Sequence, residues 1–152
     1  MPTAKQQLDG MIEKYEPAIA SLAQAALKKM RKLLPGAVEL VYDNYNTLAI
    51  GFGPDDKAGH ALFSIALYPR WVSLYFFFGG KLQDPSKLLK GSGKLIRHLV
   101  LSTAAMLDDP GVLHLIEQSL ELAPVPIDVT MKNTLLIKSI SAKQRPRRPV
   151  KS

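Results

Sequence analysis

The feature that most constrains the fold is a change of hydrophobic period just after Pro35-Gly36. Before this point, apolar residues recur every three or four positions from Pro17 to Leu33, which predicts an amphipathic helix. After it, short β-strand candidates follow in close succession: Val38 to Tyr42, Thr47 to Phe52, His60 to Tyr68 and Val72 to Phe78. Such short connections favour antiparallel pairing, because a parallel pair needs a crossover of about a dozen residues or more.

Four further segments complete the predicted fold. Thr3 to Tyr15 predicts an N-terminal helix, and Asp109-Pro110 supplies a cap and a first-turn proline for a helix that extends to Leu122. Arg97 to Leu101 is a fifth strand candidate, and Thr134 to Ile140 could form a further strand. We therefore expect an α+β fold, in which N-terminal and C-terminal helices pack on one face of an antiparallel sheet of about five strands.

The length of 152 residues fits one domain followed by a tail. We expect the domain to span residues 1–140, and residues 141–152 to form a basic, disordered tail because they are too polar and proline-rich to pack. Because the sequence contains no cysteine, it excludes disulfides, thiolate metal sites and cysteine nucleophiles. The N-terminus has no apolar run behind a basic start, and no segment approaches the roughly 20 apolar residues of a membrane span, so we expect a cytoplasmic protein without a membrane partner.

The net charge of +7 is concentrated near the C-terminus. Residues 1–130 carry 13 basic and 13 acidic side chains, so the surplus lies beyond them. The tail can attract nucleic acid or an acidic partner by counterion release, although no aromatic residue is interleaved for base stacking. The alternative is a solubilising terminus that binds nothing. The tail candidates are Lys143, Arg145, Arg147, Arg148 and Lys151.

One central stretch carries a resemblance to a known family. Residues 72–101, VSLYFFFGGKLQDPSKLLKGSGKLIRHLVL, combine a strand ending in aromatics and glycine, a DP turn, a KGSGK loop and a strand that starts near Arg97. This pattern resembles the YdhG-like domain family, and the likeness in layout covers roughly residues 15–123. The resemblance implies a small α+β domain; most members have no assigned activity, and one branch is regarded as frataxin-like iron chaperones.

The glycine loop is the first candidate ligand site. Glycines let backbone N–H groups converge on an anion, and the loop also offers cationic side chains. It is not a Walker A loop, because Leu95 follows Lys94 where Ser or Thr would hold magnesium. The structural alternative is that the two glycines only let the chain turn and re-enter the sheet. The candidates are Lys90, Gly91, Ser92, Gly93, Lys94 and Arg97.

Aromatic residues on the strands are the second candidate. Most should lie in the core, but a small sheet has one covered face, and those on the other face would form an apolar patch or concave site. We expect Tyr42, Tyr45, Trp71 and Tyr75 there, because their hydroxyl and indole N–H groups suit a site that is partly exposed to water. Formation of a homodimer through this face is the competing use.

Metal and catalytic patterns are weak. Iron would need a cluster of oxygen or imidazole ligands, and the candidates Asp43, Asp55, Asp56, His60, Asp108 and Asp109 show no ligand spacing. No GxSxG nucleophile elbow is present, so we predict no catalytic residue and no cofactor. The leading hypothesis is a non-enzymatic domain that binds a small ligand or protein partner on the aromatic face and glycine loop. Iron delivery and nucleic-acid binding through the tail are the alternatives.

Overall fold

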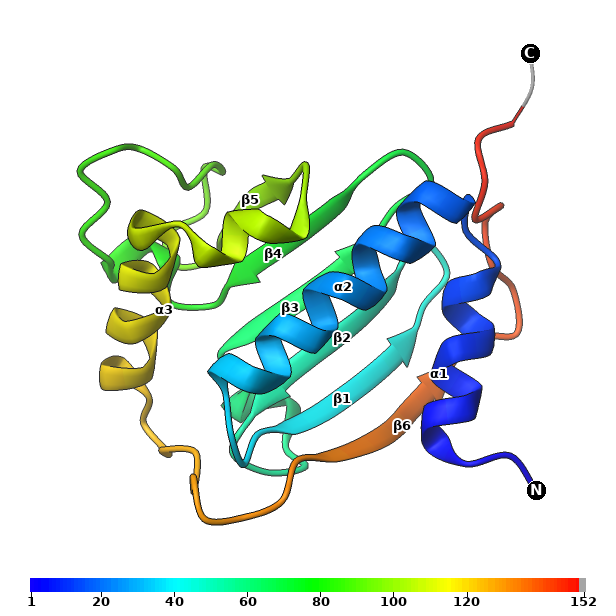
Figure 1. The fold of residues 1–152 in the computed structure, drawn as a ribbon, viewed down its shortest axis with the longest axis horizontal. Helices are drawn as coiled ribbons and strands as arrows, with labels where there is room; N and C mark the ends of the chain where they lie inside the picture. The colour runs from blue at the N-terminus through cyan, green and yellow to red at the C-terminus, as the bar shows by residue number, and fades with distance from the viewer. Residues whose placement is uncertain (151–152) are drawn as a thin grey trace.

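Six strands form one mixed sheet in the order β5-β4-β3-β2-β1-β6 in the computed structural model, which describes residues 1–150 (Figure 1). The strands are β1 (Val38–Asp43), β2 (Leu48–Gly53), β3 (Phe63–Leu67), β4 (Val72–Phe76), β5 (Arg97–Leu101) and β6 (Thr134–Ile140). The helices are α1 (Ala4–Glu13), α2 (Pro17–Leu33) and α3 (Pro110–Leu122), with 3-10 turns η1 (Ala58–His60), η2 (Gly79–Lys81) and η3 (Ala104–Asp108). The predicted α+β class is confirmed.

The sheet differs from the expected five antiparallel strands in its last member. β1 to β5 pair antiparallel with their sequence neighbours, but β6 adds beside β1 and runs parallel to it. The chain between β5 and β6 contains α3 and a long connection, so it is long enough to return to the far edge of the sheet. The strand predicted from His60 starts only at Phe63, because residues 58–60 form η1 instead.

Local sequence signals place the starts of α1 and α3 where we expected them. Thr3 and Gln6 form a capping box, in which the Thr3 hydroxyl accepts from the Gln6 N–H at 3.1 Å and the Gln6 side chain accepts from the Thr3 N–H at 2.8 Å. Asp109 accepts from the Gly111 N–H at 2.8 Å, and Pro110 occupies the first turn of α3. These contacts satisfy backbone donors that the helices leave unpaired.

The core lies between the helices and one face of the sheet. α1 and α2 lie across the same face in Figure 1, and apolar residues of α3 join the same cluster. Alternate residues of each strand point to this core, as in Ile50, Ile65 and Leu74 on adjacent strands. The intervening residues point to the other face, which we call the open face. At its centre lie small residues: Ala49, Gly51, Ser64, Ala66 and Ser73.

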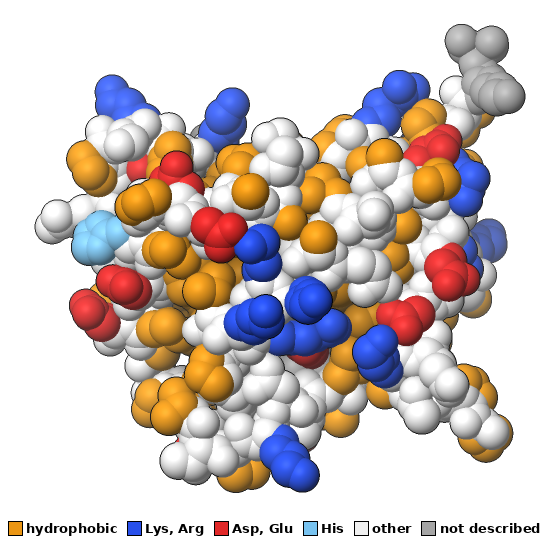
Figure 2. Space-filling model, viewed as in Figure 1, with side chains coloured by type: hydrophobic (Ala, Val, Ile, Leu, Met, Phe, Trp, Pro, Cys, Tyr) orange, Lys and Arg blue, Asp and Glu red, His pale blue; other side chains and the backbone are white. Residues whose placement is uncertain are grey.

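The helix face also carries basic side chains (Figure 2). Lys28, Lys29, Arg31 and Lys32 lie in the C-terminal half of α2. Lys29 forms an ion pair with Asp108 of η3 at 2.7 Å, and Arg31 pairs with the buried Glu39 of β1 at 2.8 Å. No helix within residues 1–150 combines the length and the apolar run needed to cross a bilayer.

The segment after β6 departs from the expected disordered tail. Residues 141–150, which we call the C-terminal strap, run past the β1–β2 turn to the junction of α1 and α2 (Figure 1). Arg147 is 6% exposed, and its guanidinium donates to Asp43 at 2.8 Å and to the Asn44 carbonyl. The polar and proline-rich composition led us to expect disorder. The contacts that hold the strap are polar, and they join residues about a hundred positions apart in sequence, so composition could not show them. Lys151 lies outside the described residues.

Candidate functional site

Two adjoining cavities lie on the open face, beside η1 and the glycine loop. The smaller, about 170 Å³, has Ala49, Gly51 and Ser64 on its floor and Tyr42 and Phe77 beside them. The larger, about 570 Å³, is lined by Phe77, Phe78, Gly93, Lys94, Leu95 and Ile96. Ala58, Ala61 and Phe77 line both, so the two cavities meet along these residues. We call the pair the open-face groove.

Small residues on β2 and β3 make the floor of the groove. Ala49, Gly51 and Ser64 occupy open-face positions where a larger side chain would fill the space above the strands. A Cβ built on Gly51 would meet no atom closer than 3.7 Å and would lie 3.8 Å from the Ala61 Cβ, so a small side chain fits there in ordinary van der Waals contact. The hollow is therefore a direct consequence of residue size at alternate strand positions.

The segment from Pro54 to Ala61 folds back over the sheet to form one side of the groove. A Cβ on Gly53 would lie only 3.0 Å from the Ala61 Cα, so glycine permits this close approach. Asp55 closes the segment, since its carboxylate accepts from the Lys57 N–H at 3.0 Å and lies 2.8 Å from His60 Nδ1. The hydrogen bond with His60 lowers the pKa of Asp55 below its ordinary value of 3.8.

The glycine loop forms the opposite side. It packs directly on the chain after β4, where a Cβ on Gly80 would lie 1.9 Å from the Lys94 carbonyl oxygen. The Gly80 N–H donates to the Leu95 carbonyl at 2.7 Å, and Arg97 Nε donates to the Gly93 carbonyl at 2.7 Å. Gly91 has a φ of 119°, a conformation that favours glycine. Part of the glycine pattern therefore serves chain geometry, as the structural alternative predicts.

The chemistry of the groove is apolar with one charge. The residues that line it are aromatic, aliphatic or small, and Lys94 is the one charged residue among them. Leu95 and Ile96 are 41% and 50% exposed, so these apolar side chains lie open to a ligand at the rim. Such a surface suits an apolar molecule that carries a negative group.

The predicted aromatic residues divide between different places. Tyr42 lines the groove, whereas Trp71 stacks on Tyr68 with ring centroids 4.7 Å apart. Tyr75 hydrogen-bonds the Tyr68 hydroxyl at 2.7 Å and lies over His98 at 5.2 Å. Burial and the hydrogen bond with Tyr75 raise the pKa of Tyr68. These rings form a row on the β3–β5 part of the open face, beside the groove and outside its lining.

The remaining candidates lie away from the groove or at its edge. Tyr45 is exposed in the β1–β2 turn, where its carbonyl accepts from the Arg145 N–H at 2.8 Å. Lys90 and His98 exchange backbone hydrogen bonds at 2.7 and 2.9 Å, which extends the sheet beside β5. Ser92 and Lys90 are exposed and do not line either cavity, and Arg97 turns back on its own loop.

No metal cluster appears among residues 1–150, where no three His, Asp or Glu side chains come together. Asp43 pairs with Arg147, Asp55 with His60, and Asp108 with Lys29, so each of these candidates has a local partner. Asp56 is exposed in the segment before η1, and Asp109 caps α3. Iron binding stays a prediction that ligand titration must test.

The apolar side of the site was not predicted from the sequence. Phe77, Phe78, Leu95 and Ile96 line it together with Ala58 and Ala61, and none of these six was among the predicted site residues. The signal that could have shown the groove is the run of small residues at alternate positions of two paired strands, as in Ala49 and Gly51 opposite Ala66 and Ser64.

No family model, curated protein or solved structure matches this chain. The resemblance of residues 72–101 to the YdhG-like family therefore stays a prediction.

Proposed function

We propose that this protein is a binding domain that takes a small apolar anion, such as a fatty or aromatic carboxylate, in the open-face groove. The observation that carries the proposal is the pair of adjoining cavities with apolar walls and Lys94 as their one charged residue. Burial of the apolar body supplies the affinity, and the lysine selects for a negative head group.

The size of the groove supports a small ligand. The larger cavity, about 570 Å³, lies within the roughly 300–1,000 Å³ typical of small-molecule sites. The smaller one can receive the end of a chain or ring between Tyr42 and Phe77. Both sides are held by hydrogen bonds, at Asp55 and at Arg97, so little ordering is needed when a ligand binds.

The test is a titration with decanoate and decanol, which share a chain and differ in charge. We expect decanoate to bind more tightly and to raise the melting temperature, because it binds the native state. Lys94→Gln should weaken decanoate binding about tenfold and leave decanol unchanged. Lys90→Gln is the matched control, since Lys90 belongs to the same loop and is exposed but does not line the groove.

A second variant tests the location independently of charge. Gly51→Val places methyl groups in the smaller cavity, where the Cβ itself has room, and should weaken both ligands without unfolding the protein. Equal loss in the two lysine variants, or no binding of either probe, would refute the proposal. A concentration-dependent dimer that Gly51→Val weakens would favour self-association through the open face instead.

A further inference from the structure

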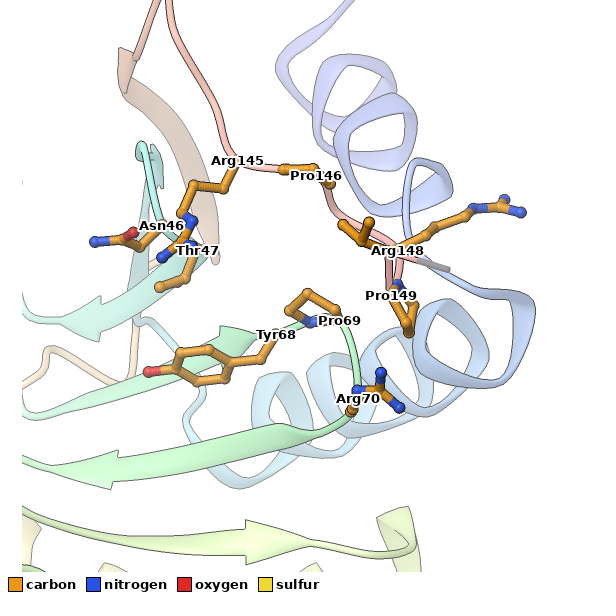
Figure 3. Close-up of a pocket in the computed structure, with 10 residues that line it drawn as sticks. Asn46, Thr47, Tyr68, Pro69, Arg70, Arg145, Pro146, Arg148 and Pro149 are labelled. Carbon is orange, nitrogen blue, oxygen red and sulfur yellow. The ribbon is translucent and has the colours of Figure 1, made fainter. Parts of the chain in front are cut away.

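A separate cavity of about 720 Å³ lies between the C-terminal strap and two sheet turns (Figure 3). The β1–β2 turn contributes Asn46 and Thr47, and the β3–β4 turn contributes Pro69 and Arg70. The strap closes the other side with Arg145, Pro146, Arg148 and Pro149. This cavity shares no lining residue with the open-face groove, so it is a second site with its own chemistry.

The charge of this cavity is wholly positive. Its lining includes Arg70, Arg145 and Arg148 and contains no acidic residue. Within residues 1–150, none of the three forms an ion pair, whereas Arg31 and Arg147 each bind a carboxylate. Figure 3 shows the Arg145 side chain reaching toward Asn46 and Thr47. The Arg148 side chain extends away from them, so the unpaired guanidinium groups beside the space are those of Arg70 and Arg145. Together these two cations attract a ligand with more than one negative charge.

The strap is held in place, so these arginines do not belong to a free tail. Arg147 lies between Arg145 and Arg148 in sequence but is buried, and it binds Asp43 at 2.8 Å. The Arg145 N–H donates to the Tyr45 carbonyl at 2.8 Å, and Arg148 Nε donates to the Lys14 carbonyl at 3.2 Å. The backbone that presents the charged groups is therefore fixed before a ligand arrives, which lowers the ordering cost of binding.

We propose that this cavity binds the phosphate group of a small phosphorylated molecule. Guanidinium groups match phosphate oxygens in paired hydrogen bonds, and a doubly charged phosphate makes fuller use of two arginines than a carboxylate does. Tyr68 and the prolines supply apolar surface for the organic part of the ligand. The bounded space favours a small molecule over a nucleic-acid strand, which would need an extended track of charge and exposed stacking rings.

The experiment is a calorimetric titration of the full chain with inorganic pyrophosphate and with adenosine diphosphate at about physiological salt. We expect saturable binding of one equivalent. Arg145→Gln and Arg70→Gln should each weaken it about tenfold or more, because each removes charge-assisted hydrogen bonds. Both arginines are exposed, so the variants should keep the fold. Lys143→Gln removes an exposed charge from the same strap without touching the cavity lining and should change affinity less than about twofold.

Three outcomes would overturn the proposal. The first is no saturable binding of either probe. The second is an equal loss of affinity in Lys143→Gln, which would show only general attraction to a basic segment. The third is tighter binding of single-stranded oligonucleotides, with an affinity that grows with their length, which would make the strap part of a nucleic-acid surface.

Discussion

At the scale of single residues, two buried acids on β1 organise the buried ion pairs of the protein. Glu39 and Asp43 are each 2% exposed, and each has an arginine partner from a different part of the chain. A buried carboxylate requires such a partner, because an unpaired charge in the interior is costly. The two acids therefore hold α2 and the C-terminal strap to the same strand.

We predict that Arg147→Ala lowers the free energy of unfolding by about 3–5 kcal/mol, because it leaves the Asp43 carboxylate buried without its counter-ion. Urea unfolding measures the change. Arg148→Ala, the next residue but exposed, should cost less than about 0.5 kcal/mol. A similar small loss in both variants would contradict the buried pairing.

Substitution of Tyr42 should raise stability or leave it unchanged, in contrast to substitution of Arg147. Its hydroxyl is buried, and no residue of the described chain hydrogen-bonds it. A buried hydroxyl without a partner costs roughly 1–3 kcal/mol, so Tyr42→Phe should leave stability unchanged or raise it by up to that amount. Thermal and urea unfolding of the variant measure this, and a clear loss of stability would show that the hydroxyl has a partner in solution.

At the scale of elements, Tyr15 joins the helices to the sheet. It lies between α1 and α2, is 1% exposed, and donates to the Leu67 carbonyl while accepting from the Leu48 N–H, both at 3.1 Å. Leu48 and Leu67 are opposite each other on β2 and β3, so one hydroxyl ties the interhelical turn to both strands. Arg147 lies over the same ring, 5.8 Å from its centre.

This contact predicts a loss of stability in alkali. Burial raises the pKa of Tyr15 above its ordinary value of 10.0, so above that pH the unfolded chain releases a proton that the folded chain retains. The contribution of Tyr15 to the free energy of unfolding should therefore be constant below pH 10. It should fall as the pH rises above 10 toward the higher pKa of the folded protein. Urea midpoints between about pH 9 and 11 measure the slope.

Tyr15→Phe is the control for that slope. It should cost about 1–3 kcal/mol at neutral pH, because the Leu48 N–H loses its buried acceptor, and it should show a shallower decline above pH 10. An unchanged slope in the variant would assign the alkaline loss to other groups, such as Tyr68.

At the scale of the whole molecule, the basic C-terminus is part of the folded body. Of the surplus charges beyond residue 130, Arg147 lies inside an ion pair, and Arg145 and Arg148 line the second cavity. Lys138 of β6 donates to the Asp56 carbonyl at 3.0 Å and so supports the segment beside the open-face groove. β6 pairs with β1, and the strap continues this pairing with hydrogen bonds to the Asp43 and Tyr45 carbonyls.

We predict that a chain ending at residue 140, which keeps β6 and loses the strap, is less stable by several kcal/mol, because Asp43 loses its counter-ion. Amide hydrogen exchange should report faster exchange in β1 and the β1–β2 turn than in β4. A truncated chain as stable as the full one would restore the expectation of a disordered tail.

Much of the fold follows from local sequence. The periods of three to four and of two, with proline, glycine and cap residues, predicted all three helices and six strand segments, and the short turns predicted the antiparallel pairing of β1 to β4. Local patterns could not place β6, because its position beside β1 depends on which sheet edge remains free. The candidate site was predicted in part, at Tyr42, Gly93 and Lys94.

The sequence by itself determined the elements, the absence of cysteine chemistry and the basic C-terminus, because each depends on neighbouring residues or on simple counts. Only the tertiary structure decided which aromatics meet, that small side chains on paired strands leave a groove, and that Arg147 is buried against Asp43. Those facts depend on contacts between residues far apart in the chain, and the packing energy of the whole molecule fixes them.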